Sequence, residues 1–315
     1  KIPAMSADAL VPMPVMAMVV GLAVLLLAVF FVRGGGQKKF LNKERQQLTL
    51  TKKEYISHDT LHLTFTLPKA TPVLGLPTGK HFKIFAPNVA GKVAGEWNGR
   101  EDMSADEAEI HRMYTPVTSD RDLGKVELVL KAYKGGVNEN FVDGGKMSQY
   151  MAGVAEGESI TVSGPWGMHE YLGRGVFKSG SKQLTCKKLG MIAGGTGITP
   201  MLQIAATILD DPSDTTEVSV LYANQTEDDI LVREMLDGYA AKHPTRFKVW
   251  YTLDRPPTRW KFSSGFISDA MIAERLPGPQ EESLVLMCGP PPMIKFACLP
   301  NLTKLGYTKA QQVVF

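Results

Sequence analysis

The chain has 315 residues, of which 44% are hydrophobic and 21% are charged, proportions that suit a globular protein of about two domains. Its formal net charge of +3 is too small to indicate a nucleic-acid-binding protein, and we expect no nucleic-acid partner. Its three cysteines lack a metal-type spacing and are odd in number, so we expect neither a metal site nor a disulfide framework.

The N-terminal segment contains an apolar run that is long enough to cross a membrane. Residues 15–32 are 18 consecutive residues without a charge, and a helix rising ~1.5 Å per residue spans about 27 Å over them. A cleaved signal peptide would have a shorter apolar region with positive charge before it, whereas here Arg33, Lys38 and Lys39 follow the run. We therefore expect residues 1–36 to be a membrane anchor with a glycine tether, and the remainder to be cytosolic.

Residues 37–183 show the pattern of short strands separated by turns. Residues 61–67 alternate apolar and polar side chains, as a half-buried strand does, and further strands are expected at 80–85, 112–115, 126–133 and 159–163. Several short strands bounded by Gly and Pro favour a small antiparallel barrel. Residues 88–110, with their acidic run, are expected to form a surface excursion.

Residues 184–315 instead alternate between strand and helix patterns. Strands are expected at 189–193, 217–223, 247–252 and 283–287, and helices at 200–209, 230–242, 268–274 and 291–305. This alternation predicts a parallel sheet covered by helices. The expected fold is thus α+β with two domains: an antiparallel β-barrel, then an α/β parallel-sheet domain, preceded by an N-terminal transmembrane helix.

Two loops lie at expected strand ends in the second domain. Three glycines fall within residues 194–197, between a strand and a helix, and Cys288 opens a run of glycine and prolines. Because ligands of parallel sheets bind at the carboxyl ends of strands, both loops can flank one crevice. Each also has a plainer interpretation, since the glycines can form a tight connection and Cys288 can be a small buried hydrophobe.

Two motifs in the first domain suit an anionic, aromatic ligand. Arg112 can bind a phosphate through its planar fork, and Tyr114 can pack on an aromatic ring, although an ordinary strand with a surface arginine gives the same pattern. Residues 144–148 place two glycines before a helix start, whose N–H groups can receive a phosphate. A plain helix start is the alternative.

The ordered set of residues 112–119, 144–148, 191–201 and 288–293 resembles the NADH–cytochrome b5 reductase family, among the ferredoxin-reductase-like flavoproteins. The resemblance implies FAD between the two domains, with Arg112 at its pyrophosphate, Tyr114 beside the flavin–ribityl region and Thr115 near the reactive flavin nitrogen. The other flavin contacts that it implies are Val129, Lys131, Gly145, Lys146, Met147, Ser148 and Thr199.

The same resemblance implies a site for NADH and three catalytic residues. Asp229 would favour the ribose hydroxyls of NADH over the phosphate of NADPH, and Asp228 is a neighbour that can share this role. Thr115, Lys131 and Cys288 would serve catalysis, with Cys288 orienting the nicotinamide without a covalent bond. The positive charge of Lys131 gives the separate hypothesis that it stabilises reduced flavin. The nicotinamide side would be lined by Gly194, Gly195, Thr196, Cys288, Gly289 and Pro290.

The implied reaction passes hydride from NADH to FAD and then single electrons to the haem of cytochrome b5, at the endoplasmic reticulum or the mitochondrial outer membrane. Two alternatives stay open: a relative that serves another haem or quinone acceptor, such as the flavin fragment of nitrate reductase, and a non-enzymatic, membrane-tethered nucleotide sensor. A set of basic residues is either a docking patch for an acidic haem protein or a solvated face. They are Lys178, Lys182, Lys187 and Lys188.

Overall fold

A computed structural model describes residues 38–137, 139–280 and 282–315. The chain divides into two units, Lys1–Lys38 and Lys39–Phe315. The expected anchor at residues 1–36 lies outside the described residues. Within the described ranges, no helix is both long and apolar enough to cross a bilayer.

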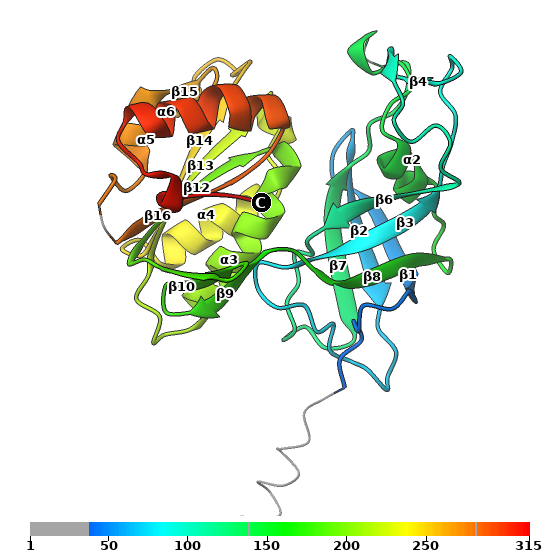
Figure 1. The fold of residues 1–315 in the computed structure, drawn as a ribbon, viewed down its shortest axis with the longest axis horizontal. Helices are drawn as coiled ribbons and strands as arrows, with labels where there is room; N and C mark the ends of the chain where they lie inside the picture. The colour runs from blue at the N-terminus through cyan, green and yellow to red at the C-terminus, as the bar shows by residue number, and fades with distance from the viewer. Residues whose placement is uncertain (1–37, 138, 281) are drawn as a thin grey trace, which may run out of the picture. The chain divides into compact units, whose positions relative to one another are not determined.

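The first half of this unit is a six-stranded antiparallel sheet with the strand order β6-β3-β8-β1-β2-β7 (Figure 1). Alternate residues of its strands, such as Leu61, Leu63 and Phe65, are fully buried in one apolar core, because successive side chains point to opposite faces. Its strands are β1 (Gln46–Tyr55), β2 (Thr60–Thr66), β3 (His81–Pro87), β6 (Glu109–Tyr114), β7 (Lys125–Lys131) and β8 (Ser159–Trp166).

The expected barrel is not closed by a strand ladder. Strands β6 and β7 are the two edges of the sheet, and in the described residues no ladder joins them. The chain after β6 reaches β7 through one backbone bond, from Val117 N to Glu127 O at 2.9 Å. Pro116 has no N–H to give, and the Thr118 hydroxyl accepts from Glu127 N in place of a backbone carbonyl. The ladder therefore stops where the chain turns away.

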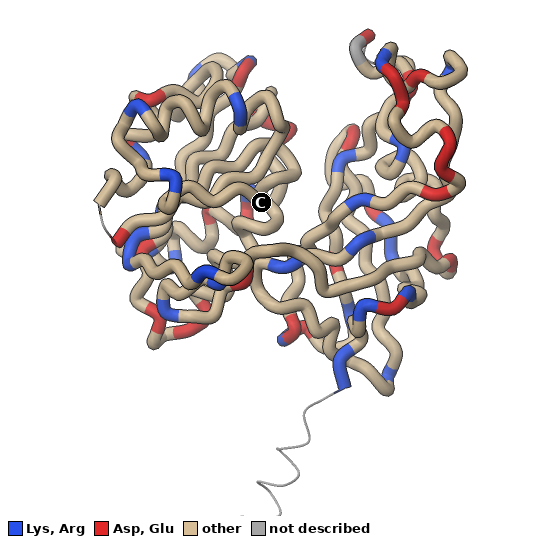
Figure 2. Tube along the Cα trace, viewed as in Figure 1, with Lys and Arg blue, Asp and Glu red and all other residues tan. Residues whose placement is uncertain are grey.

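The excursion, which the structure bounds at residues 88–108 between β3 and β6, contains a small hairpin. Its strands β4 (Glu96–Trp97) and β5 (Arg100–Glu101) pair across Asn98 and Gly99, and both turn residues have positive φ, as a two-residue hairpin turn requires. Figure 2 shows acidic residues gathered on this segment. Helix α2 (Lys146–Gly153) buries Met147 and Met151 in the core of the first sheet.

The second sheet is parallel, with the order β15-β14-β13-β12-β16-β17. Its central strand is buried almost throughout, as expected for a sheet covered on both faces. One face packs on α3 and α4, and the other packs on α5 and α6. The strands are β12 (Lys188–Gly194), β13 (Glu217–Asn224), β14 (Phe247–Leu253), β15 (Ser263–Ser264), β16 (Ser283–Cys288) and β17 (Gln312–Val314), and the helices are α3 (Ile198–Asp210), α4 (Arg233–Lys242), α5 (Asp269–Arg275) and α6 (Leu299–Lys304).

Two of the expected helices differ from the structure. The helix predicted at 230–242 begins only at Arg233, because Thr226 and Asp229 form a capping box that closes the short turn η3 (Glu227–Asp229) first. The helix predicted at 291–305 is split into a π-helical turn, η4 (Met293–Cys298), and α6. Pro300 lies at the junction and cannot donate to the carbonyl four residues earlier, so the regular α pattern breaks there.

A three-stranded antiparallel sheet was not predicted. It comprises β9 (His169–Gly173), β10 (Val176–Ser179) and β11 (Lys182–Thr185). The side chains of Tyr171 and Phe177 extend from this sheet into the apolar core that also contains residues of α3 and α4. The Tyr171 hydroxyl donates to the buried Asp214. Tyr171 and Asp214 are 43 positions apart in the sequence, so only the folded chain shows that they are in contact.

Candidate active site

The two loops at the carboxyl ends of β12 and β16 meet, as the sequence predicts. A Cβ on Gly197 would lie 2.2 Å from Cys288 O, and one on Gly289 would lie 3.1 Å from Gly194 Cα. The two backbones therefore pack directly on each other, so a Cβ does not fit at Gly197 and would force a shift at Gly289.

Space for a ligand beside these loops is confined to one side. A Cβ on Gly194 would meet Met293 Sδ at 2.6 Å, so that space is filled, whereas nothing lies within 4 Å of the corresponding position on Gly195. Gly195 has a φ of +52°, Thr196 is exposed, and the Tyr222 hydroxyl fixes the turn by donating to Gly195 O at 2.9 Å. Tyr222 was not among the predicted site residues, and its only signal in the sequence was a hydroxyl within the apolar run at residues 220–223.

Asn224 marks the same crevice from the carboxyl end of β13. Its side chain is 7% exposed, and neither amide atom has a hydrogen-bond partner in the described residues. The neighbouring Tyr222 hydroxyl donates its proton to Gly195 O at 2.9 Å, so it can offer Asn224 only an oxygen lone pair and no proton. A buried amide without partners costs about 1–3 kcal/mol, which favours a ligand that supplies them.

Cys288 enters the crevice as a neutral thiol. The residue is half-buried, and burial raises the pKa of its thiol to about 11. A nucleophilic cysteine needs a lowered pKa, so this environment suits a packing and orienting role. Thr199, behind the loop, is buried and donates its hydroxyl to Thr196 O at 3.2 Å.

Lys131 lies at the centre of an ion-pair cluster that joins the antiparallel half to the parallel half. Its Nζ donates to Asp59 Oδ2 at 3.0 Å and to Asp229 Oδ1, and its side chain is 7% exposed. Burial opposes its charge, but the bonds to Asp229 and Asp59 outweigh this and raise the pKa of Lys131. Burial also opposes the charge of Asp229, yet bonds from Lys131 and Thr226 lower its pKa.

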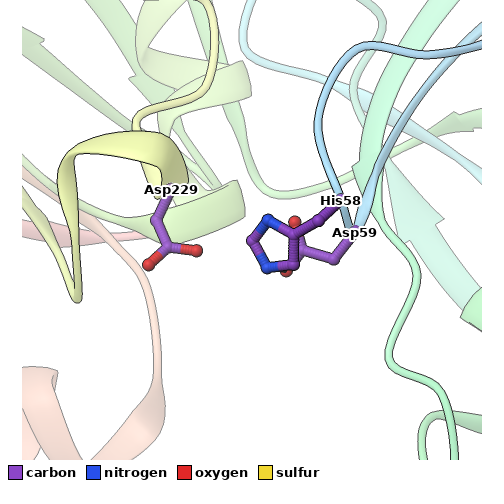
Figure 3. A group of neighbouring side chains, drawn as sticks. All are labelled: His58, Asp59 and Asp229. Atoms are coloured by element: carbon purple, nitrogen blue, oxygen red, sulfur yellow. Dashed lines mark ion pairs between the residues drawn. The ribbon is translucent and has the colours of Figure 1, made fainter.

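The Lys131 contacts also account for a group with metal-ligand chemistry. His58, Asp59 and Asp229 bring their ligand atoms within 4.8 Å of one another, and Figure 3 shows the Asp229 carboxylate facing the other two from a separate segment. The Lys131 ammonium binds both carboxylates. The ammonium offsets part of the charge of the two carboxylates and bridges them, and we interpret the group as an ion-pair cluster.

The flavin-type motifs of the first half also come together, because α2 lies against β6. Arg112 is exposed, and in the described residues its guanidinium bonds to His111 O without a carboxylate partner. The backbone N–H groups of residues 146–148 have no hydrogen-bond acceptor among the described residues. A guanidinium without a carboxylate partner and helix N–H groups without an acceptor fit an anionic phosphate group.

Other predicted flavin contacts have varied surroundings. Tyr114 and Thr115 are half-buried, and burial raises the pKa of Tyr114. Val129 packs into the core of the second sheet, and its strand β7 lies beside Gly195–Gly197. The Lys146 ammonium does not join the Arg112 side, because it bonds to Asp102 at 2.5 Å and to Asn88 at 2.7 Å in the excursion.

Comparison with known proteins assigns both halves. Residues 47–97 and 101–171 match the oxidoreductase FAD-binding domain, and residues 191–299 match the oxidoreductase NAD-binding domain. The chain is 46% identical over 306 residues to NADH-cytochrome b5 reductase 2 of Xenopus laevis, covering 94% of this chain and 98% of that protein. The chain belongs to the NADH–cytochrome b5 reductase family.

Further members of the family support this assignment. NADH-cytochrome b5 reductase 1 of Bos taurus is 46% identical over 278 residues, which are 86% of each chain. The crystal structure of the cytochrome b5 reductase domain of Ulva prolifera nitrate reductase has a TM-score of 0.79 at 41% identity, covering 88% of this chain and all of that one.

The family and the two matched domains make this protein an FAD-dependent oxidoreductase whose cofactors are FAD and NADH. The described residues fit both groups. Arg112 and the first turn of α2 offer donors to a diphosphate. The open side of Gly195 and the unpaired amide of Asn224 offer a second nucleotide space and hydrogen-bonding groups.

Proposed function

We propose that this protein is a membrane-anchored NADH–cytochrome b5 reductase. The observation that carries the proposal is the position of β7, which lies beside the Gly195–Gly197 loop and ends at Lys131. A strand of the FAD-binding half thereby meets the crevice of the NAD-binding half. The two cofactors supply hydride and single-electron chemistry, and the protein supplies orientation and charge.

On the FAD side, the residues provide donors and packing. Arg112 and the N–H groups at the start of α2 hold the diphosphate, Tyr114 packs beside the flavin, and the Thr115 hydroxyl hydrogen-bonds to the ring system. The remaining proposed FAD contacts are Val129, Lys131, Gly145, Lys146 through its backbone, Met147, Ser148 and Thr199.

On the NADH side, Gly195 leaves room for the nicotinamide, and the neutral thiol of Cys288 restricts where its ring lies. Asp229 accepts from a ribose hydroxyl and repels a phosphate. One Asp229 oxygen is bonded to Thr226 and the other to Lys131, so a bound ribose must share or replace the Lys131 contact. The other residues proposed to line this side are Gly194, Thr196, Gly289 and Pro290.

For the electron acceptor we propose cytochrome b5, which the relatives carry in their names. The Lys178 and Lys182 side chains are exposed on β10 and β11, and they are candidates to dock an acidic haem protein. Lys187 pairs with Glu282 at 2.8 Å, which reduces its availability. We further propose that residues 1–36 anchor the protein in the endoplasmic reticulum or the mitochondrial outer membrane.

Other electron acceptors must be compared directly with cytochrome b5, because the similar structure from Ulva prolifera is the reductase domain of a nitrate reductase. The test is to purify the full chain, record its visible spectrum, titrate it with NADH and NADPH, and then add oxidised cytochrome b5, a quinone or a ferric complex. We expect a yellow protein that NADH bleaches and that cytochrome b5 reoxidises fastest. A colourless preparation would support the nucleotide sensor instead, and preference for a quinone would replace cytochrome b5.

A further inference from the structure

The excursion at residues 88–108 is bound to one short turn of the FAD-binding half. That turn comprises residues 143–145 and leads directly into α2. Trp97 Nε1 donates to Gly144 O at 2.8 Å, and Asn98 Nδ2 donates to the same oxygen at 2.9 Å. Asn98 Oδ1 accepts from Asp143 N at 2.7 Å and from Gly144 N at 3.1 Å. The Asn98 side chain alone thus bonds to both N–H groups and a carbonyl oxygen of the turn.

The turn also contributes a side chain to this contact, that of Asp143. The two carboxylate oxygens of Asp143 accept from Lys92 N at 2.8 Å and from Asn98 N at 2.6 Å. These backbone bonds lower the pKa of Asp143, the one from Lys92 first. The carboxylate therefore stays ionised and connects Lys92 and the hairpin turn of the excursion to residues 143–145.

A buried ion pair continues the attachment into the first residue of α2. Lys146 is 5% exposed at its side chain, and its Nζ lies 2.5 Å from Asp102 Oδ2, 3.3 Å from Ser104 Oγ and 4.8 Å from the centre of the Trp97 ring. The bonds from Lys146 and Ser104 lower the pKa of Asp102 to about 2. The Lys146 charge is therefore neutralised within the protein.

The turn needs outside support because its geometry depends on glycine. Gly144 has a φ of +74°, and a Cβ there would lie 2.5 Å from Tyr133 O. Glycine loses more conformational entropy on ordering than other residues, so a glycine pair holds its shape only when neighbours fix it. The backbone N–H groups of residues 146–148 directly follow this turn, and they have no protein acceptor in the described ranges.

We propose that the excursion is a clasp that fixes residues 143–146 in the conformation that binds the FAD diphosphate and so slows the release of FAD. The inference rests on the proposed placement of the diphosphate at the start of α2. Trp97, Asn98 and Asp102 are positioning residues in this scheme, and none of them touches the cofactor. The interval left out of the FAD-domain match, residues 98–100, lies at the hairpin turn that supplies Asn98.

The test compares FAD release from the purified holoprotein and three variants. Asn98→Gly keeps the positive φ while removing the amide, Trp97→Phe keeps a ring while removing the N–H, and Glu101→Gln alters an exposed residue of the same hairpin as a control. Release is followed by the fluorescence of free FAD after dilution. We expect release about tenfold faster for Asn98→Gly, since hydrogen bonds of ~1 kcal/mol each are lost, and no change for Glu101→Gln.

A second measurement separates the clasp from general stability. The thermal midpoint is recorded with and without added FAD, and the clasp predicts that the increase caused by FAD shrinks in Asn98→Gly and Trp97→Phe. If the thermal midpoints with and without FAD fall equally in these variants, and FAD is released at the wild-type rate, the clasp is wrong and the proposed function is unaffected. A wild-type protein that binds no FAD overturns both.

Asp102→Asn gives an independent outcome. If Lys146 serves the clasp, releasing it from Asp102 should loosen the turn and speed FAD release. If the freed ammonium instead turns to the diphosphate, FAD is released more slowly than from wild type, and the clasp is wrong.

Discussion

Lys131 and Asp229 lie 98 positions apart in the sequence and form a nearly buried ion pair. Lys131 ends a strand of the antiparallel sheet, and Asp229 belongs to the capping box before α4 of the parallel half. The contact joins the two halves at residues that we assign to opposite sides of hydride transfer. We therefore expect substitutions at this pair to change both the stability of the protein and its choice between NADH and NADPH.

Replacing Lys131 with Met should lower both stability and NADH turnover. Asp59 and Asp229 would face each other without a cation, and we expect the free energy of unfolding to fall by about 2 kcal/mol. This is below the ~3–5 kcal/mol for fully buried pairs, because Asp59 is 22% exposed. Urea denaturation measures the loss. Lys125→Met, which removes an exposed pair with Glu127, should change stability by less than ~1 kcal/mol, and equal losses would contradict the cluster's role.

The same pair gives a defined pH dependence. The pKa of Lys131 is raised, so its stabilisation is complete below the unfolded value of ~10.4 and is lost as pH rises through the folded value. The pKa of Asp229 is lowered, so its stabilisation is present above ~3.9 and is lost as pH falls through the folded value. The difference in unfolding free energy between wild type and Lys131→Met should be flat from about pH 5 to pH 9. A steep change near pH 7 would point to another group.

Asp229→Asn should relax the preference for NADH. Without the carboxylate, repulsion of the NADPH phosphate disappears, and we expect the ratio of kcat/KM for NADH over NADPH to fall about tenfold, which corresponds to ~1.4 kcal/mol. Asp228→Asn is the matched control, because Asp228 is the exposed neighbour in the same turn. A larger shift in the Asp228 variant would move the recognition role to that residue.

Cys288 should behave as a neutral thiol throughout the physiological range. With its pKa raised to about 11 by burial, the alkylation rate by iodoacetamide should be low at pH 7 and rise about tenfold per pH unit up to pH 9, since only the thiolate reacts. Cys186→Ser with Cys298→Ser isolates the signal. A plateau near pH 7 would show an activated cysteine and reopen a covalent role.

Arg112→Ala should weaken FAD binding without altering the fold, because Arg112 is exposed and its guanidinium bonds only to His111 O in the described residues. Loss of charge-assisted bonds worth ~1.5–3 kcal/mol corresponds to about 10- to 150-fold in the dissociation constant of FAD. Quenching of FAD fluorescence by the apoprotein measures it. Arg112→Lys should recover part of the loss, and an unchanged constant in Arg112→Ala would remove the residue from the site.

Local patterns in the sequence were sufficient for most of the elements. Alternating apolar residues located β2, and a glycine-rich turn between apolar runs located β12 and α3, although the turn itself forms the short helix η2 (Gly195–Gly197). Such signals act over a few residues, where backbone geometry and side-chain periodicity are decisive. The order of four motifs was enough to indicate the family, because it depends on residue identity alone.

The tertiary structure decided which partner each charged side chain takes. Lys146 appears in the sequence beside two glycines as a phosphate contact, yet its ammonium pairs with Asp102, 44 positions away. Gly194 and Gly195 appear in the sequence as equivalent lining residues of the nicotinamide side, yet Met293 fills the space beside Gly194 and leaves that beside Gly195 open. Ion pairs and close backbone contacts depend on distances between segments that only folding brings together, and no local pattern records them. The sequence therefore determined the elements and the family, while the fold determined which of their side chains remain free for FAD and NADH.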